Sequence, residues 1–260
     1  MNKEILQDEV DTMNLQLLMQ SLYDSGDYFI SINRGKVDSS NYWQVVKDPD
    51  GIIRNRISEE DIYINDVDYI VHYINSLTNG GRILDIGCGF GWLLKSLNDK
   101  WEKYGLEPDS NAAKIASQNC FIKNMSFEED VYPENHFDII NMHHVIEHID
   151  NPLKTMKEIK KILKPNGKLI IATPDFDSGA ARLFGSKYRL LHDKTHISLF
   201  SNESMHRMLR DFNFKIYKSE FPFFNTRFFS LSNLTSLFDT KKISPPFYGN
   251  FMTFFCENKK

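Results

Sequence analysis

The sequence predicts a protein of the α/β class, with a mostly parallel sheet of seven strands flanked by helices. Two observations lead to this prediction. From Arg82 onward, short apolar runs alternate with segments of helical period, which is typical of βαβ units. The first of these runs leads directly into a glycine-rich turn, Gly87 to Gly91, of the kind that joins a buried strand to the next helix.

The chain is expected to divide at residue 79. Residues 1–78 are predicted to form a helical segment that covers the ligand site, and residues 79–260 are predicted to form the main domain. Apolar residues at roughly helical spacing predict a helix over residues 1–25. A second helix is predicted to begin at Ser58, whose hydroxyl can cap it ahead of three acidic residues, and to end near Leu77.

The main domain is predicted to contain five strands connected by helices, followed by one more helix and two final strands. Each strand is a short run rich in apolar residues, and the helices show apolar residues at helical spacing. The predicted strands are 82–87, 103–109, 120–125, 137–142, 168–175, 214–221 and 250–258. The predicted helices are 92–100, 110–119, a helix directly after Met142, 152–164 with a Pro-Asn-Gly stop, and 201–211 with Ser201 as its cap.

Three segments fall outside this alternation. Residues 176–200 are predicted to be a loop or small insertion that forms a lid, and residues 221–260 are rich in phenylalanine. The run 221–238 is expected to be core and cover for the sheet, with a dimer contact as the alternative. Near the N-terminus, Tyr42 and Trp43 are expected to close over the bound ligand.

Composition argues against several classes of protein. The 260 residues contain 31 Lys and Arg against 35 Asp and Glu, a net charge of −4, whereas nucleic-acid-binding proteins normally carry a basic surplus. Cys88, Cys120 and Cys256 are too few and too scattered for a disulfide framework or a zinc finger, which favours a reducing, cytoplasmic location. No run approaches the roughly 18 apolar residues of a membrane-spanning helix, and the acidic N-terminus is unlike a signal peptide.

The strongest functional signal is the segment Asp85-Ile-Gly87-Cys88-Gly89-Phe90-Gly91. Glycines allow the backbone to turn sharply and to approach a ligand closely, and the N–H groups at the start of the following helix can bind an anion. Glu107 ends the next strand, where a carboxylate can accept two hydrogen bonds from a ribose diol. The order D-x-G-x-G-x-G differs from the dinucleotide fingerprint G-x-G-x-x-G and from the phosphate loop that ends in Gly-Lys-Ser/Thr.

This segment resembles motif I of the class I S-adenosylmethionine-dependent methyltransferases. Later segments resemble further motifs of the same family in the same order, at 105–109, 133–152 and 163–175. The stretch 196–216 is similar to the subgroup that includes ubiquinone-type and sugar O-methyltransferases. The resemblance covers residues 80–217, and it implies a Rossmann-like sheet with the last strand antiparallel and S-adenosylmethionine as the cofactor.

The resemblance also assigns a role to each matching residue of the cofactor site. The glycine loop would surround the methionine part of the cofactor, and the acid after the second strand would bind the ribose hydroxyls. Residues just past the third strand would touch the adenine, and residues at the end of the fourth strand would approach the methionine end. The expected cofactor-binding residues are therefore Asp85, Gly87, Cys88, Gly89, Phe90, Gly91, Glu107, Pro108, Ser126, Phe127, Met142 and His143.

A second group, His144, Glu147 and His148, follows the fourth strand. If this segment is helical, the spacing i, i+3, i+4 places the three side chains on one face, where they can hold a divalent metal. Some relatives carry Glu-x-x-Glu-His here and bind magnesium with it; His144 replaces the first Glu, which suits zinc, iron or manganese better. The favoured alternative needs no metal: Glu147 and His148 support the loop, and His144 acts as a base or contacts the substrate.

A third feature is the segment 191–196, which contains His192 and His196. An imidazole can take the proton of a hydroxyl group as a methyl group is transferred to its oxygen. His196 matches the family's histidine before the Leu-Phe-Ser turn and is the first candidate for this base, ahead of His144 and His192. His196 can instead bond to the backbone and pack the lid, and methyl transfer does not always need a base.

The resemblance implies transfer of a methyl group from S-adenosylmethionine to a small polar acceptor, an oxygen of a sugar or of a glycan or capsular polysaccharide precursor. One alternative changes the acceptor to a quinone, a phenol or an amine, and another is a module that binds the cofactor without catalysis. An NAD or nucleotide-sugar enzyme is disfavoured by the order of the glycines. The expected partner is the small-molecule acceptor, with no nucleic acid and no membrane insertion, and the chain is expected to be a monomer or a homodimer.

Overall fold

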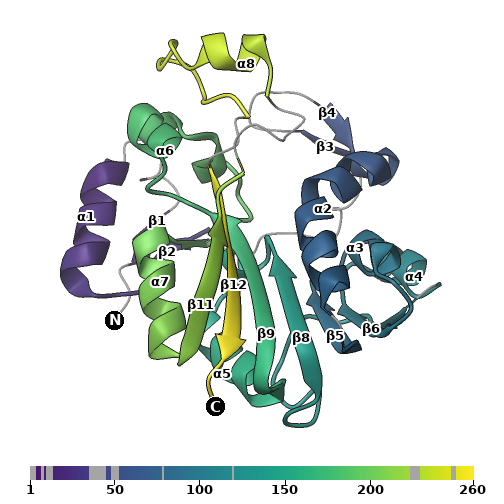
Figure 1. The fold of residues 1–260 in the computed structure, drawn as a ribbon. Helices are drawn as coiled ribbons and strands as arrows, with labels where there is room; N and C mark the ends of the chain where they lie inside the picture. Colours follow the sequence, from purple (N-terminus) through teal and green to yellow (C-terminus); the bar gives the residue numbers. More distant parts are fainter. Residues whose placement is uncertain are drawn as a thin grey trace.

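A sheet of seven strands forms the centre of the computed structural model (Figure 1). In chain order its strands are β5 (Gly81–Ile86), β6 (Trp101–Leu106), β7 (Phe121–Lys123), β8 (Phe137–His143), β9 (Leu163–Pro174), β11 (Phe214–Glu220) and β12 (Phe251–Asn258). Their order in the sheet is β11-β12-β9-β8-β5-β6-β7, and β12 runs antiparallel to both of its neighbours while the other pairs are parallel. These features confirm the predicted fold class. The structure describes residues 4–6, 9, 14–34, 45–47, 53–77, 79–118, 120–222, 229–246 and 250–260.

Helices cover both faces of this sheet because successive strand residues point to opposite sides. Ile83 and Ile139 share a core with α2 and α3, whereas their neighbours Leu84 and Ile140 share another with α5 and α7. The helices of the main domain are α2 (Glu60–Ser76), α3 (Trp92–Ser96), α4 (Ser110–Ala116), α5 (Pro152–Ile162) and α7 (Asn202–Asp211). The carboxyl ends of the parallel strands therefore meet at one edge, the upper one in Figure 1, where the loops with the predicted site residues begin.

Two predicted helix boundaries are wrong. Ser58 ends a 3₁₀ turn, η2 (Arg56–Ser58), and its hydroxyl donates to the carbonyl oxygen of Asn55, so it does not cap α2. The Pro-Asn-Gly sequence lies inside β9 instead of ending α5. The side-chain amide of Asn258, at the end of β12, donates to the carbonyl oxygens of Leu163 and Lys164, which ties this stretch to the sheet directly after Ile162. By contrast, Ser201 caps α7 as predicted, in a capping box.

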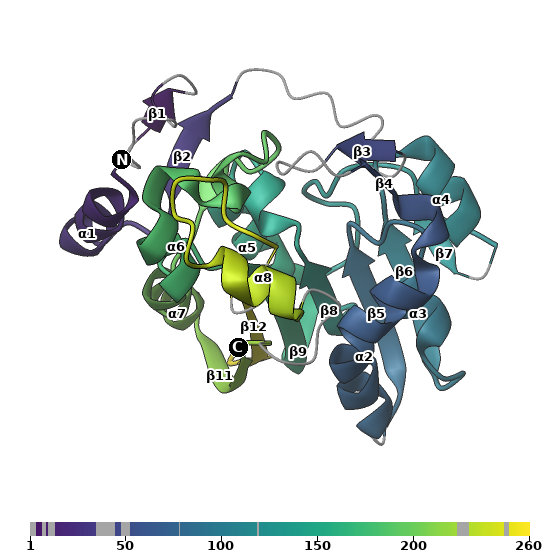
Figure 2. The same ribbon diagram turned by 90° about the horizontal axis from the view of Figure 1, so that it is seen from above.

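The N-terminal segment packs against the insertion that follows β9. Strands β1 (Glu4–Leu6) and β2 (Ile30–Asn33) form a second sheet with β10 (Ser198–Leu199). A separate core joins α1 (Leu15–Ser25) to α6 (Gly179–Phe184) and to the 3₁₀ turns η4 (Gly185–Lys187) and η5 (Arg189–Leu191). These segments lie side by side in both Figure 1 and Figure 2.

This arrangement corrects two predictions. Residues 4–6 form a strand where a helix was predicted, and the short hairpin of β3 (Val45–Lys47) and β4 (Ile53–Asn55) means that the N-terminal segment is not wholly helical. Of the two alternatives for residues 176–200, the structure has the small insertion, built of a helix, 3₁₀ turns and a strand. Strands β1, β3 and β4 have only three residues each, which is too short for a recognisable period. Strand β2 is held by β10, where Ser198 pairs with Ser31, and a local pattern cannot indicate so distant a partner. Tyr42 and Trp43 lie outside the described residues.

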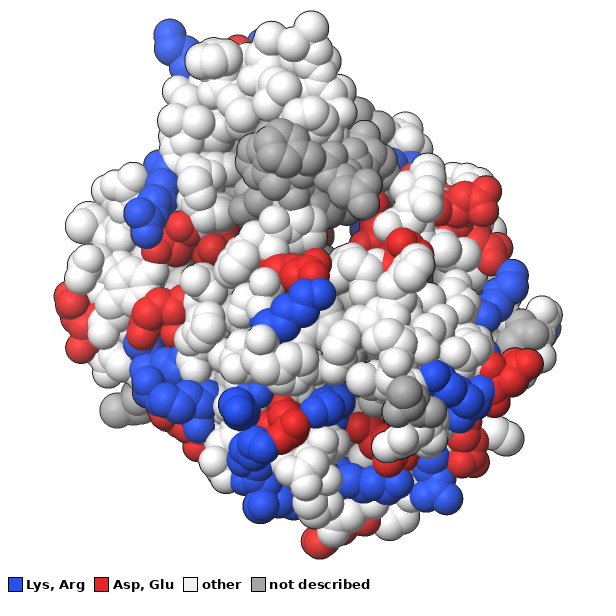
Figure 3. All heavy atoms as spheres, viewed as in Figure 1, with Lys and Arg blue, Asp and Glu red and all other residues white. Residues whose placement is uncertain are grey.

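The described residues of the run 221–238 are exposed or half-buried, which contradicts the core role predicted for that run, whereas β12 at the end of the phenylalanine-rich segment is buried in the sheet. Leu231 begins α8 (Leu231–Ser236) and is 78% exposed, and Phe238 just beyond the helix is 91% exposed. Figures 1 and 2 place α8 above the carboxyl edge of the sheet, away from the main helices. In Figure 3 this lobe carries few charged side chains, whereas Lys, Arg, Asp and Glu are interspersed over the body below. No helix in the described ranges is long and apolar enough to cross a membrane.

Candidate functional site

The glycine loop after β5 adopts a backbone shape that only glycine tolerates. Gly87 and Gly91 have φ values of +70° and +74°, in the left-handed region that side chains disfavour. A Cβ atom at Gly87 would lie 2.5 Å from Val145 Cγ2, and one at Gly91 would lie 2.9 Å from the Cβ of Ala116. The N–H groups of Gly87 and Cys88 donate to the carbonyl oxygen of Leu106, at 2.8 and 3.0 Å, which fastens the loop to the end of β6.

Glu107 lies directly after β6 and locks the glycine loop in place. Its carboxylate is buried, with 3% of the residue exposed. Oε2 accepts a hydrogen bond from the N–H of Gly89 at 2.8 Å, and Oε1 accepts one from the N–H of Asp109 at 2.8 Å. Pro108, between these two acids, accepts a hydrogen bond from the side chain of Asn124. Glu107, which is predicted to bind the ribose, and the glycine loop, which is predicted to surround the methionine part, are therefore joined by hydrogen bonds.

Asp85, near the end of β5, is a buried carboxyl group beside this unit. Its Oδ1 accepts a hydrogen bond of 2.7 Å from the side-chain amide of Asn141 on β8. Burial raises the pKa of Asp85 to about 7, and the charge of Glu107 adds to the effect. Two buried oxygens nearby, Asn141 Oδ1 and Asp109 Oδ2, have no hydrogen-bond partner among the described residues. Unsatisfied acceptors, a locked carboxylate and a glycine loop fit the polar groups of the predicted nucleoside cofactor.

We expect Asp85 to make the protein less stable as the pH rises. The folded chain holds the proton up to about pH 7, whereas an unfolded Asp releases it near pH 3.8. Between these values only the folded state binds the proton, so raising the pH lowers the free energy of unfolding, by up to about 4 kcal/mol at roughly 1.4 kcal/mol per pH unit. Urea unfolding between pH 4.5 and 8 should show a flatter dependence in Asp85→Asn. An unchanged slope, or an equal change in the surface control Asp68→Asn, would contradict this.

The remaining predicted cofactor residues lie in the glycine loop, after β7 and at the end of β8. Cys88 and Phe90 are buried within the loop, and Ser126 and Phe127 follow β7, the first exposed and the second packed on the main core. The side chain of Met142 is fully buried in the main core, so the contact predicted for this residue would come from its backbone. The ring of His143 is half-buried, and burial together with the neighbouring His144 lowers its pKa well below the usual range.

The segment after β8 is not the predicted helix. His144 has a φ of +56°, and its N–H donates to the carbonyl oxygen of Ala172 at 2.9 Å. Only a single 3₁₀ turn, η3 (Ile146–His148), follows. The argument from a shared α-helical face is therefore wrong, although Nδ1 of His144 still lies 3.2 Å from Oε1 of Glu147.

The structure groups a different set of potential metal ligands from the one predicted. One ligand atom each from Glu147, His148 and His196 lie within 4.8 Å of one another, and His196 thus takes the place given to His144. Because a carbonyl oxygen can only accept, the Nδ1 atoms of both histidines donate, His148 to Thr195 at 2.8 Å and His196 to Leu190 at 2.8 Å. Histidines that bind a metal through one ring nitrogen usually donate from the other in this way, and histidines in a hydrogen-bonded cluster without a metal do the same.

Glu147 is the centre of this cluster. Its side chain is fully buried, Oε1 faces His144, and Oε2 accepts a hydrogen bond of 3.0 Å from the hydroxyl of Thr173. Burial alone would raise the pKa of Glu147, but the hydrogen bond from His144 and the nearby histidines outweigh it and lower the pKa to about 2. Glu147 is therefore a carboxylate at neutral pH.

Burial sets His196 apart from His144 and His192, which are both half-buried, and a contact to the backbone sets His192 apart from His144. His196 is 5% exposed and bonded to the backbone of the insertion, and Nε2 of His192 lies 2.8 Å from the carbonyl oxygen of Ser186. The side chain of His144 is 27% exposed, at the carboxyl end of β8. These contacts support the packing role for His196 and move His144 ahead of it as the candidate base.

A row of six rings, the aromatic row, runs along the carboxyl edge from the glycine loop to the start of β12. Centroids of successive rings lie 4.8, 5.5, 6.4, 4.4 and 4.5 Å apart. The members, in order, are Phe90, Trp92, Tyr63, His143, His144 and Phe251. Sequence reasoning missed Tyr63, Trp92, Phe251 and the neighbouring Thr173, because no local pattern sets them apart from core residues.

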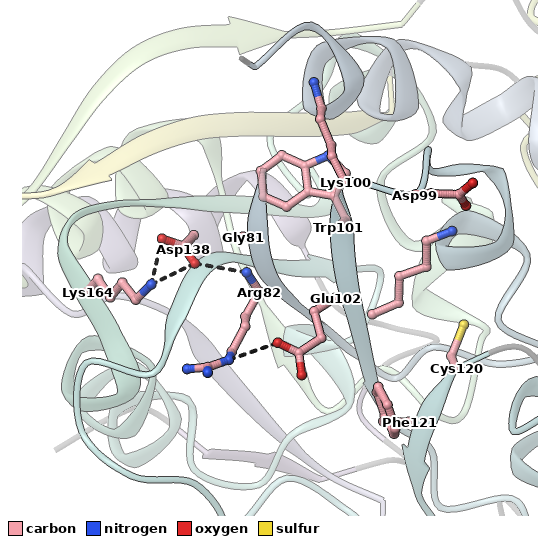
Figure 4. Close-up of a pocket in the computed structure, with 11 residues that line it drawn as sticks. Gly81, Arg82, Asp99, Lys100, Trp101, Glu102, Cys120, Phe121, Asp138 and Lys164 are labelled. Carbon is pink, nitrogen blue, oxygen red and sulfur yellow. Dashed lines mark hydrogen bonds and ion pairs between the residues drawn. The ribbon is translucent and has the colours of Figure 1, made fainter. Parts of the chain in front are cut away.

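A pocket of about 710 Å³ lies at the opposite, amino edge of the sheet (Figure 4). Arg82 pairs with Glu102 at 3.0 Å, and Lys164 pairs with Asp138 at 2.8 Å. Lys100 donates to backbone carbonyl oxygens at the end of α2. These pairs satisfy the cations of the pocket within the protein, so the candidate site remains at the carboxyl edge.

Known proteins share sequence and fold with this chain. A family model described as a methyltransferase domain matches residues 63–219, more than half of the chain. An uncharacterized protein of Methanocaldococcus jannaschii is 29% identical over 161 residues, which cover 62% of this chain and 75% of that protein. A ubiquinone biosynthesis O-methyltransferase of Glaesserella parasuis is 30% identical over 144 residues, 48% of this chain and 61% of the relative. The chain therefore spans about three fifths of that relative's length.

A solved structure extends the comparison to the fold. It is a Thermotoga maritima SAM-dependent methyltransferase, described as a possible histamine N-methyltransferase, with a TM-score of 0.57 and 23% identity. The match covers 78% of this chain and 95% of that chain, which shows a shared fold. The part of the chain matched by the family model contains the glycine loop, Glu107 and the cluster around Glu147.

Proposed function

Because this chain belongs to the methyltransferase family, we propose that it transfers the methyl group of S-adenosylmethionine to a hydroxyl oxygen of a small polar acceptor, a sugar or a glycan precursor. The observation that carries the choice of oxygen is the partly exposed imidazole of His144, which follows His143 directly after β8, the strand that pairs with β5 before the glycine loop. A hydroxyl group must lose its proton as it is methylated, and an imidazole is suited to accept that proton at neutral pH.

Glu107 and the glycine loop would bind the cofactor, and His144 would accept the proton. The carboxylate of Glu107 would accept hydrogen bonds from the ribose hydroxyls, and the glycine loop would surround the methionine part. When bound, S-adenosylmethionine supplies an electrophilic methyl carbon. The acceptor oxygen forms a bond to this carbon as the carbon–sulfur bond breaks and leaves its electron pair on sulfur. The hydroxyl proton passes to Nε2 of His144 and from there to solvent.

A quinone-type phenol is the second acceptor to consider, because two observations favour it. The aromatic row offers ring faces and edges beside His144, against which a flat aromatic acceptor can pack. A relative at 30% identity is named a ubiquinone biosynthesis O-methyltransferase. Both acceptors present a hydroxyl oxygen, so the role proposed for His144 is the same in each case.

The experiment that tests the proposal is calorimetric titration with S-adenosylmethionine, followed by an acceptor screen that compares sugars with phenols. We expect micromolar binding that is unchanged by a chelator, since both oxygens of Glu147 already accept hydrogen bonds and the cluster is satisfied without an ion. Binding without turnover on any hydroxyl acceptor would favour a non-catalytic module. A stoichiometric metal whose removal weakens binding would instead identify Glu147, His148 and His196 as ligands.

A further inference from the structure

We propose that Glu147 is a positioning residue, whose buried carboxylate holds the imidazole of His144 in the Nδ1–H tautomer. Nε2 then keeps the lone pair that accepts the proton of the acceptor hydroxyl. The inference rests on the proposed role of His144 as the base, and it adds the residues that give that base its chemical form: Glu147, and behind it Thr173.

The hydrogen bonds fix the roles of the atoms. Oε1 of Glu147 lies 3.2 Å from Nδ1 of His144. An ionised carboxylate can only accept hydrogen bonds, so Nδ1 must carry the proton whenever this bond is made to a neutral imidazole. A histidine that is free in water prefers the other tautomer, with the proton on Nε2. Without Glu147, Nε2 of His144 would therefore carry the proton and could not act as a base.

The carboxylate is itself held from the opposite side. The hydroxyl of Thr173, on β9, donates to Oε2 of Glu147 at 3.0 Å, and both residues are fully buried. The backbone carbonyl of Glu147 accepts a hydrogen bond from the N–H of Ile197 at 2.8 Å. The carboxylate plane is thus set by groups from two other segments and cannot rotate away from His144 without losing a buried hydrogen bond.

The imidazole ring of His144 also has little room to turn. The rings of His143 and Phe251 lie 4.4 and 4.5 Å away, with interplanar angles of 80° and 73°. The N–H of His144 donates to the carbonyl oxygen of Ala172, and its φ of +56° is a sparsely populated value for a residue with a side chain. A single ring orientation, with Nδ1 on the carboxylate and part of the ring exposed, follows from these contacts.

The same carboxylate stabilises the ring after it has accepted a proton. An imidazolium at His144 would face a fully buried anion, where charge interactions are stronger than in water. Other ionisable groups around Glu147 are His148 on η3 and His196 on the insertion, and Asp193 lies 3.8 Å from His196. Among the described residues, Glu147 is the carboxylate that contacts the His144 ring, which makes it the group to change.

The test is to observe the protonated nitrogen of His144 directly, by long-range ¹H–¹⁵N NMR on chelator-treated protein with ¹⁵N-labelled histidine. The chain has 8 histidines, and the signals of His144 are those missing from His144→Gln. We expect Nδ1–H in the wild type, a shift to Nε2–H in Glu147→Ala, and a mixture of the two in Thr173→Val. Asp193→Asn is the matched control and should leave the His144 signals unchanged.

Each outcome decides the proposal without knowledge of the acceptor. An Nε2–H tautomer in the wild type overturns it, even if Glu147→Ala fails to fold. An Nδ1–H signal that persists in Glu147→Ala also overturns it, because another group would then hold the ring. Loss of cofactor binding or of turnover would count against the proposed function but would leave the tautomer result standing, so the two failures are distinguishable.

Discussion

Replacing Glu107 by glutamine should weaken the binding of S-adenosylmethionine about 100-fold. The carboxylate accepts hydrogen bonds from the N–H groups of Gly89 and Asp109, and it is the acid proposed to bind the ribose. An amide nitrogen at one of these positions can no longer accept, so the variant loses hydrogen bonds to a charged group, worth about 1.5–3 kcal/mol, and leaves a buried donor unsatisfied. Calorimetric titration measures the change directly.

Glu102→Gln is the matched control for this prediction. Glu102 lies at the amino end of β6, the strand that Glu107 follows. It is exposed there and pairs with Arg82. Its substitution should change the affinity less than twofold. If both variants bind equally well, the carboxylate of Glu107 holds only the loop and not the ribose. A Glu107→Gln protein with the wild-type unfolding midpoint and weaker binding would separate ligand contact from folding.

Replacing His144 by glutamine should lower turnover about 100-fold to 10,000-fold, the usual contribution of a general base, while cofactor affinity changes little. The reason is that the partly exposed imidazole lies after β8, whereas the cofactor loop is held by separate contacts to Leu106 and Glu107. The measurement is kcat on whichever hydroxyl acceptor the screen identifies, with calorimetry of the cofactor alongside.

Two other histidines provide the comparison for His144→Gln. His72→Gln, on the exposed side of α2, should have no effect on either quantity. His196→Gln removes a buried ring bonded to Leu190, so we expect a lower unfolding midpoint with turnover reduced less than in His144→Gln. The opposite order, with His196→Gln the slower enzyme at equal stability, would restore His196 as the base.

The cofactor loop could be predicted from the sequence because its requirements are local. A left-handed backbone at Gly87 and Gly91 and the close approach of Val145 exclude a side chain whatever the rest of the fold does. The strands of the main domain were equally predictable, since alternating buried positions such as Ile83 and Leu84 need apolar residues on both faces of a covered sheet. A family resemblance could add roles to these residues because the same local constraints recur.

The cluster around Glu147 could not be predicted in the same way. The spacing of His144, Glu147 and His148 suggested one face of an α-helix, but the positive φ of His144 and the 3₁₀ turn after it are set by hydrogen bonds to β9 and to the insertion. His196 joins the group from 48 residues beyond His148, and Thr173 joins from β9. No pattern within a short stretch of the sequence indicates these contacts.

The sequence by itself determined the fold class, the glycine loop and the acid after β6, because each depends on the conformational freedom or burial pattern of neighbouring residues. Only the tertiary structure decided which histidine is accessible, what holds Glu147, and how the N-terminal segment joins the insertion through β2 and β10. The physical reason is that burial and hydrogen bonding between distant segments depend on how the fold brings strands and turns together. The spacing of residues along the chain does not indicate this arrangement.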